Sequence, residues 1–194
     1  MKKLLLILLP LAVVCGCGKI DLSDGGNYNS ENNYQKKRYK VGDFYSDNNK
    51  DGIVISITDD GLHGKIISMQ EKLCSWSTEH IATSAIDEEN GVNNMKKIQS
   101  IIGWREKYPA FAWCADLGDD WYLPSFHEIY DIKDLNIVPN MCDKHYWTST
   151  EYNYSHAYAV TMSPRVGRSW TDKYGLTGGM SEDYWIYVRA IAEF

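Results

Sequence analysis

The chain has 194 residues and a formal charge of −6. Its first sixteen residues hold Lys2 and Lys3 and no acid, so the rest carries −6 − 2 = −8. An acidic surface excludes nucleic acid as a partner, because that ligand requires a basic stripe. The length suits one domain with its own core.

The first residues predict a lipoprotein signal peptide over residues 1–16. The basic pair Lys2-Lys3 precedes an apolar run over residues 4–14, which is too short to span a bilayer as a helix. A small residue must precede a lipidated cysteine, and Gly16 before Cys17 meets that need, whereas Cys15 follows Val14. We therefore expect lipid on Cys17 and anchoring in a membrane. The alternatives are an ordinary secretory signal and a single transmembrane anchor.

The next segment predicts a flexible tether over residues 17–36, because it holds Gly, Asn, Ser and Glu without an apolar period. Asp21 and Asp24 resemble the acidic export signals of surface-displayed lipoproteins in Bacteroides-like bacteria. The expected location is the outer membrane, with the domain of residues 37–194 facing the cell surface or, alternatively, the periplasm.

Alternating and helical patterns follow one another along this domain. Ile53, Ile55 and Ile57 alternate and predict a strand. Asp60-Gly61 predicts a turn, after which a second strand over residues 65–69 completes a hairpin. Three helices are then expected, with inward faces formed by Met95, Ile98 and Ile102, by Ala110, Trp113, Cys114 and Leu117, and by Phe126, Ile129 and Tyr130. Pro109 opens the second helix, Gly118 ends it, and Ser125 with Glu128 forms a capping box for the third.

After residue 140 the helical period vanishes and short segments are separated by Asn, Ser, Asp and Gly. Strands are expected at residues 146–150, 157–162 and 166–171, and the last alternation covers residues 185–192. Strands first, helices in the middle and strands last predict an α+β fold with two to three helices and a C-terminal antiparallel sheet.

Three motifs in this order resemble a bacterial family with a C-type-lectin-like fold, the Lcl C-terminal domain family. Trp121-Tyr122-Leu123-Pro124-Ser125 with Glu128 is similar to its W-x-L-P-[ST]-x-x-E signature. Tyr146-Trp147-Thr148-Ser149-Thr150 resembles its Y-W-S-S-T strand, and Tyr187-Val188-Arg189-Ala190 its closing strand. The resemblance implies a C-type-lectin-like fold from about residue 39 to the end. From their own chemistry, we interpret Trp121 and Trp147 as packing residues and Arg189 as the partner of a carboxylate.

Departures from the family limit what the resemblance implies. Many relatives bridge a helix cysteine, here Cys114, to a closing-strand cysteine, but that strand position is Ala190. Cys114 is therefore expected to be a buried thiol, and a Cys74–Cys142 bridge or three free thiols remain open. The sugar-binding triplets of calcium-dependent lectins are also absent, so sugar binding does not carry over. The formylglycine-generating enzymes share the fold, but the closely placed C-terminal cysteine pair is missing here.

Metal and catalytic motifs are incomplete, so no cofactor, metal or catalytic residue is expected. Residues 47–52 match the first half of a calcium loop, yet the twelfth position is Thr58 rather than Glu, and a polar hairpin loop is the alternative. Cys142 and His145 have zinc spacing but lack a second pair. The remaining histidines are interpreted as solvated: His63, His80, His127 and His156.

The expected function is recognition of a glycan or a protein outside the cell, and the chain is not expected to be an enzyme. In C-type-lectin-like domains the long loops between the later strands form the ligand surface, which here implies residues 150–184. Aromatic residues mixed with Asn, Ser and Gly are typical of adaptable binding surfaces. The expected ligand-binding residues are Tyr152, Asn153, Tyr154, His156, Arg165, Arg168, Trp170, Tyr174 and Tyr184. The alternative is a structural or tip subunit of a surface appendage.

Overall fold

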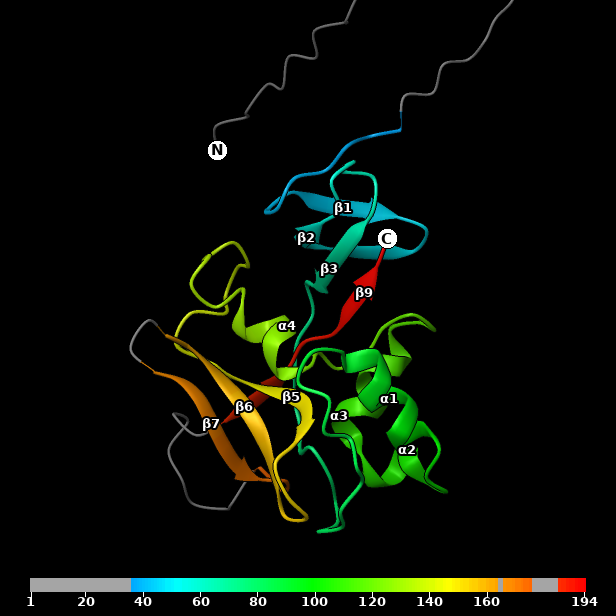
Figure 1. Cartoon of the computed structure of the whole chain (residues 1–194), viewed down its shortest axis with the longest axis vertical. Helices are drawn as coiled ribbons and strands as arrows, with labels where there is room; N and C mark the ends of the chain where they lie inside the picture. The colour runs from blue at the N-terminus through cyan, green and yellow to red at the C-terminus, as the bar shows by residue number, and fades with distance from the viewer. Residues whose placement is uncertain (1–35, 164–165, 176–184) are drawn as a thin grey trace, which may run out of the picture. The chain divides into compact units, whose positions relative to one another are not determined.

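The computed structural model describes residues 36–163, 166–175 and 185–194, which belong to one compact unit. The fold is α+β, as predicted, with helices grouped in the middle of the chain between strands (Figure 1). The predicted signal peptide, the tether and Cys17 lie outside the described residues. None of the helices that the structure describes is long and apolar enough to cross a membrane.

A four-stranded antiparallel sheet, sheet A, contains the predicted N-terminal hairpin. Its order is β1-β2-β3-β9, with bounds Phe44–Asp47, Lys50–Ile57, Gly64–Ser68 and Ile191–Glu193. The loop with the half-calcium motif is the tight β1–β2 turn, in which Asn48 and Asn49 both have positive φ. Such turns favour Asn because its side chain tolerates this conformation, and the loop has the form of a polar hairpin turn.

The predicted one-sided alternation in β2 is wrong. Ile53, Val54 and Ile55 are all buried, whereas Ile57 is exposed. The register with β3 shifts between Val54 and Ser56, and such an irregularity re-aims the side chains that follow it. Both faces of the middle of β2 are therefore covered, and only its end reaches solvent.

Sheet B has five strands in the order β4-β8-β5-β6-β7. Their bounds are Lys72–Leu73, Ile186–Val188, His145–Glu151, His156–Ser163 and Val166–Asp172. The sheet is mixed rather than antiparallel, because β8 runs parallel to β5. Strand β8 lies between β4 and β5 and pairs antiparallel with β4.

The part of the chain between strands β4 and β5 forms the four helices that the structure describes. They are α1 (Gly91–Gln99), the single turn α2 (Trp104–Lys107), α3 (Pro109–Asp116) and α4 (Phe126–Tyr130). Met95 and Ile98 are buried as predicted, but Ile102 is 93% exposed. Because α1 ends at Gln99, the helical period stops before Ile102 reaches the buried face.

The W-x-L-P segment is architectural. Ser125 and Glu128 form the predicted capping box of α4. The Glu128 carboxylate also accepts hydrogen bonds from Lys65 Nζ on β3 at 2.6 Å and from the Gly91 N–H at 3.0 Å. One buried carboxylate thus joins sheet A, α1 and α4. Trp121 is 5% exposed and Trp147 is fully buried, so both pack in the core as interpreted.

The closing segment consists of two strands rather than one. β8 and β9 belong to different sheets, and Arg189 and Ala190 connect them. The Arg189 side chain is buried and donates to Ser68 O at 2.9 Å, to Pro139 O at 3.0 Å and to Glu71 Oε2 at 3.2 Å. Its predicted pairing with a carboxylate is confirmed, and the ion pair sits where the chain changes sheets.

Candidate functional site: an aromatic face on sheet B

The β5–β6 hairpin presents two tyrosines to solvent. Tyr152 is 45% exposed and Tyr154 is 62% exposed. Asn153 between them shapes the turn, because its Oδ1 accepts the backbone N–H groups of Ser155 and His156, each at 2.9 Å. Asn153 therefore has a local structural role of the Asx-turn kind.

Strand β7 continues this surface. Arg168 and Trp170 are two residues apart and project from the same face of the strand. Their cross-strand partners on β6 are Val160 and Tyr158. Trp170 stacks on Tyr152, with ring centroids 5.2 Å apart, and Tyr152 contacts Tyr158 edge to face at 5.3 Å. Arg168 and Trp170 lie in the strand expected at residues 166–171, so their placement in a long ligand-binding loop is wrong.

The guanidinium of Arg168 is held on several sides. It lies 4.1 Å from the Tyr158 ring centroid and 4.5 Å from that of Phe126, and its Nη2 donates to Glu88 Oε1 at 2.7 Å. Cation–π contacts and an ion pair together fix its plane.

A second stack lies beyond the end of β7. The rings of His80 and Tyr174 are 4.0 Å apart and nearly parallel, and His80 Nε2 lies 3.0 Å from Asp172 Oδ1. Burial acts to raise the pKa of Asp172, but the N–H of Tyr174 and the His80 side chain outweigh it, so this pKa lies below its usual value. The carboxylate of Asp172 therefore fixes the imidazole beside the exposed Tyr174 ring.

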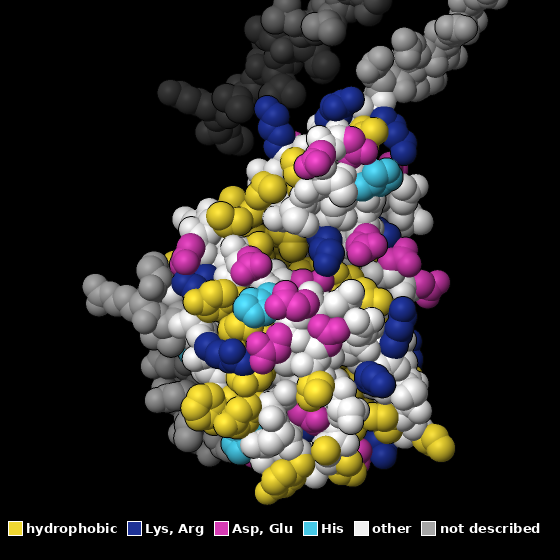
Figure 2. Space-filling model, in the orientation of Figure 1, with side chains coloured by type: hydrophobic (Ala, Val, Ile, Leu, Met, Phe, Trp, Pro, Cys, Tyr) yellow, Lys and Arg dark blue, Asp and Glu magenta, His cyan; other side chains and the backbone are white. Residues whose placement is uncertain are grey.

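We call this surface the aromatic face; it consists of His80, Tyr152, Tyr154, Arg168, Trp170 and Tyr174. In Figure 2 hydrophobic side chains gather over the lower ends of the sheet B strands, close to charged side chains of both signs. Scattered apolar side chains are normal on a surface, whereas stacked and exposed rings mark a candidate site for recognition.

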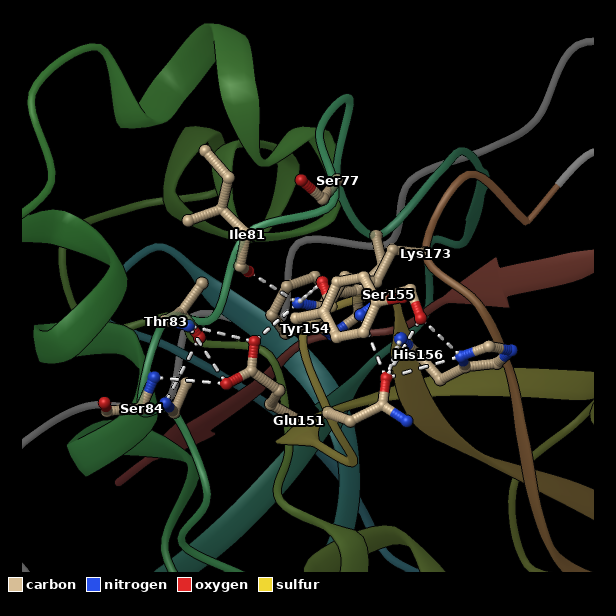
Figure 3. A network of polar contacts seen from close by, with 12 residues as sticks. Ser77, Ile81, Thr83, Ser84, Glu151, Tyr154, Ser155, His156 and Lys173 are labelled. Atoms are coloured by element: carbon tan, nitrogen blue, oxygen red, sulfur yellow. Dashed lines mark hydrogen bonds and ion pairs between the residues drawn. The ribbon is translucent and has the colours of Figure 1, made fainter.

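A buried ion pair joins Lys173 and Glu151 beside Tyr154 (Figure 3). Lys173 is fully buried, and its Nζ donates to Glu151 Oε1 at 2.5 Å, Ile81 O at 2.9 Å and Tyr154 O at 3.0 Å. All three ammonium protons therefore have acceptors. Burial lowers the pKa of Lys173, and the bond to Glu151 only partly offsets that effect.

Glu151 extends this network into the chain before α1. Its carboxylate accepts the backbone N–H groups of Thr83, at 3.0 Å to each oxygen, and of Ser84 at 3.1 Å. The pair therefore connects residues 81–84 with the β5–β6 hairpin and the end of β7. Tyr154 belongs to this hairpin, and His80 and Tyr174 directly adjoin the other two segments. The network therefore holds the backbone of the aromatic face in place.

The structure brings together most of the predicted ligand-binding residues. Tyr152 and Trp170 stack, and Arg168 lies two residues from Trp170 on β7. Asn153, Tyr154 and His156 belong to the adjoining β5–β6 hairpin, and Tyr174 stacks on His80 beyond the end of β7. Arg165 and Tyr184 lie outside the described residues.

The sequence did not reveal the other members of the site: His80, Glu88, Glu151, Tyr158 and Lys173. His80 is 92 positions from Asp172 and Glu88 is 80 positions from Arg168, and no local spacing connects them. His80 and His127 were both interpreted as solvated, but His80 contacts Asp172 and Tyr174. The Nε2 of His127 lies 3.6 Å from Glu89 and 3.9 Å from Glu88, the partner of Arg168.

The three described cysteines are free thiols, so the Cys74–Cys142 pairing is not formed. Cys114 is buried, as predicted, and burial, reinforced by nearby Cys74, raises its pKa well above the usual range. Burial also raises the pKa of Cys74, to about 11. Cys142 is exposed, and its Sγ donates a hydrogen bond to Asp143 Oδ2, whereas Cys74 is half-buried.

The part of the chain that the structure describes contains no cluster of three or more His, Cys, Asp or Glu side chains that could hold a metal ion. His145 of the predicted zinc spacing bonds instead to Thr161 Oγ1 at 2.8 Å. A cavity of about 630 Å³ lies between the β1–β2 turn, α1 and residues 119–122. Its Lys50 is paired with Asp120 at 2.9 Å, so the two charges neutralise each other.

Comparison with known proteins leaves the family open. No family model and no curated protein matches the chain. Among solved structures, a fimbrial protein from Bacteroides ovatus is similar over 68% of this chain and 36% of its own, with 14% identity and a TM-score of 0.41. The chain thus spans about a third of the length of that protein.

Proposed function

We propose that the protein is an exported lipoprotein, anchored through Cys17, whose domain recognises a ligand outside the cell through the aromatic face. The observation that carries this proposal is the pair of exposed ring stacks, together with the buried ion pair. Rigid aromatic side chains supply contact area at a low cost in conformational entropy. A surface that is ordered before binding loses less freedom when a ligand arrives.

The C-type-lectin-like fold named above is part of this proposal. Its support is the order of the three motifs and their positions in the core: the capping box of α4, buried Trp147 and buried Arg189. An appendage subunit, the alternative role, would need a long unpaired strand edge or an exchangeable terminal strand. The C-terminal strand, β9, lies at an edge of sheet A and among the described strands pairs only with β3, and β7 is a seven-residue edge strand of sheet B. These edges keep the appendage role as the alternative, whereas the stacked, exposed rings favour recognition.

The test compares alanine variants at the aromatic face with variants elsewhere. The full chain in detergent is screened against printed glycans and purified extracellular proteins. Tyr154→Ala, Arg168→Ala and Trp170→Ala are then measured against any ligand found. Phe44→Ala and Ile102→Ala are suitable controls, because both side chains are exposed and lie on other elements. His127 is unsuitable as a control because it contacts Glu88.

We expect a loss of about 2 kcal/mol of binding free energy for the best-placed ring, as is typical of a hot spot. Thermal melting shows whether each variant stays folded. Equal losses in the two sets would place the binding site elsewhere.

A further inference from the structure

The open end of the Tyr152–Trp170 stack is a specific kind of surface. Tyr152 lies between Tyr158 and Trp170, so it covers one face of the Trp170 ring. Trp170 is nevertheless 57% exposed. The face of an aromatic ring carries negative charge density and attracts weakly positive hydrogens. A pyranose ring offers such hydrogens, because the C–H bonds on one of its faces are polarised by the adjacent oxygens.

The second stack is anchored further along the same strand. Asp172 is two residues beyond Trp170 on β7, about 7 Å along the strand. Asp172 holds His80, and His80 stacks on Tyr174, which is 43% exposed. Two aromatic surfaces therefore follow each other along one strand direction, which suits a ligand made of successive rings.

The charges around these rings are paired. Arg168 and Glu88 are 2.7 Å apart, and His80 and Asp172 are 3.0 Å apart. The Arg168–Glu88 pair keeps N–H donors and carboxylate acceptors at the surface without a net charge, and His80 with Asp172 adds a ring nitrogen and a carboxylate. Hydroxyl groups both donate and accept hydrogen bonds, so they match such a surface. A strongly anionic or cationic ligand would have to compete with an ion pair already formed.

From these observations we propose that the aromatic face binds an uncharged oligosaccharide, with adjacent sugar rings on the Trp170 and Tyr174 surfaces. This inference rests on the proposed function and names its ligand class. Arg168 and Glu88 would contact hydroxyl groups of the ring on Trp170. Lys173 and Glu151 are positioning residues, because they hold the backbone that carries the rings and are themselves buried.

The experiment uses the full chain in detergent on a printed set of uncharged, uronic-acid-containing and sulfated oligosaccharides. Binding to uncharged members longer than one ring is expected. It should change little over about a tenfold rise in salt, because charge screening affects ionic contacts and not stacking. Trp170→Ala should weaken it about tenfold or more, with Trp170→Phe in between, since a smaller ring retains part of the stacking surface. Ile102→Ala is the matched control, with no expected effect.

Two results would overturn the inference. Binding confined to acidic or sulfated sugars, or lost on adding salt, would indicate ionic recognition instead. Binding of a purified protein that the Trp170→Ala variant loses, without any binding of sugars, would refute the sugar ligand while leaving recognition through the aromatic face intact. Losses at Ile102→Ala equal to those at Trp170→Ala would instead count against the proposed function itself.

Discussion

Replacing Lys173 by Met tests whether the buried ion pair holds the aromatic face. The substitution preserves much of the side-chain volume but leaves the 5%-exposed Glu151 without its counter-charge. It also removes the donor to two backbone carbonyls, those of Ile81 and Tyr154. Removing one partner of a buried pair costs about 3–5 kcal/mol. Glu151 still accepts hydrogen bonds from the N–H groups of Thr83 and Ser84, which limits the loss. We therefore expect the free energy of unfolding to fall by about 4 kcal/mol, the middle of that range.

Urea denaturation, monitored by tryptophan fluorescence, measures this loss. The urea concentration at the midpoint of unfolding should fall, while the dependence of the unfolding free energy on urea stays the same. The double variant Lys173→Met, Glu151→Gln removes both charges and keeps an acceptor for Thr83 and Ser84. It should recover about 2 kcal/mol relative to Lys173→Met alone, because no unpaired charge remains buried.

The matched control is Lys107→Met. Lys107 also pairs with a glutamate, Glu79 at 3.3 Å, but its side chain is 38% exposed. Solvent screening limits such a pair, so the loss should be below about 1 kcal/mol. The reasoning is refuted if Lys173→Met costs no more than this control, or if the double variant is less stable than Lys173→Met alone.

Four further outcomes are expected. Burial acts to raise the pKa of Glu71, but bonds from Lys144 and Tyr146 and the charge of Arg189 outweigh it and lower this pKa. The stabilisation is therefore present above the unfolded pKa of about 4.3 and is lost as the pH falls through the lower folded value. Glu71→Gln should flatten the acid limb of a stability–pH curve, and an unchanged limb would contradict this. A thiol reagent followed by peptide mass spectrometry should label Cys142 first and Cys114 only after unfolding, because one is exposed and the other buried; equal labelling rates would be inconsistent with this burial. Cys17→Ser should release the protein from the membrane fraction, whereas continued detergent partitioning would show that lipid on Cys17 is not the anchor. A chelator should leave the melting temperature unchanged, since residues 47–52 lack the acidic twelfth ligand, and a sharp fall would indicate a bound metal.

Local patterns along the chain determined several features that the structure confirms. The order of strands and helices indicated the α+β fold. Ser125 and Glu128, three positions apart, predicted a capping box that forms as expected, because its hydrogen bonds close within one helical turn. The candidate surface around Tyr152, Tyr154, Trp170 and Tyr174 came from the family resemblance together with the aromatic composition, and its role in binding stays a prediction.

Tertiary structure decided the features that depend on distant partners. The sequence left Lys173 unremarked because Glu151 and Ile81 reach its ammonium from 22 and 92 positions away. The insertion of β8 beside β5 made sheet B mixed, and a short segment of alternating residues does not specify which strands will flank it. Local hydrogen bonds can be predicted from spacing, whereas the pairing of buried charges depends on which backbone segments the fold brings together.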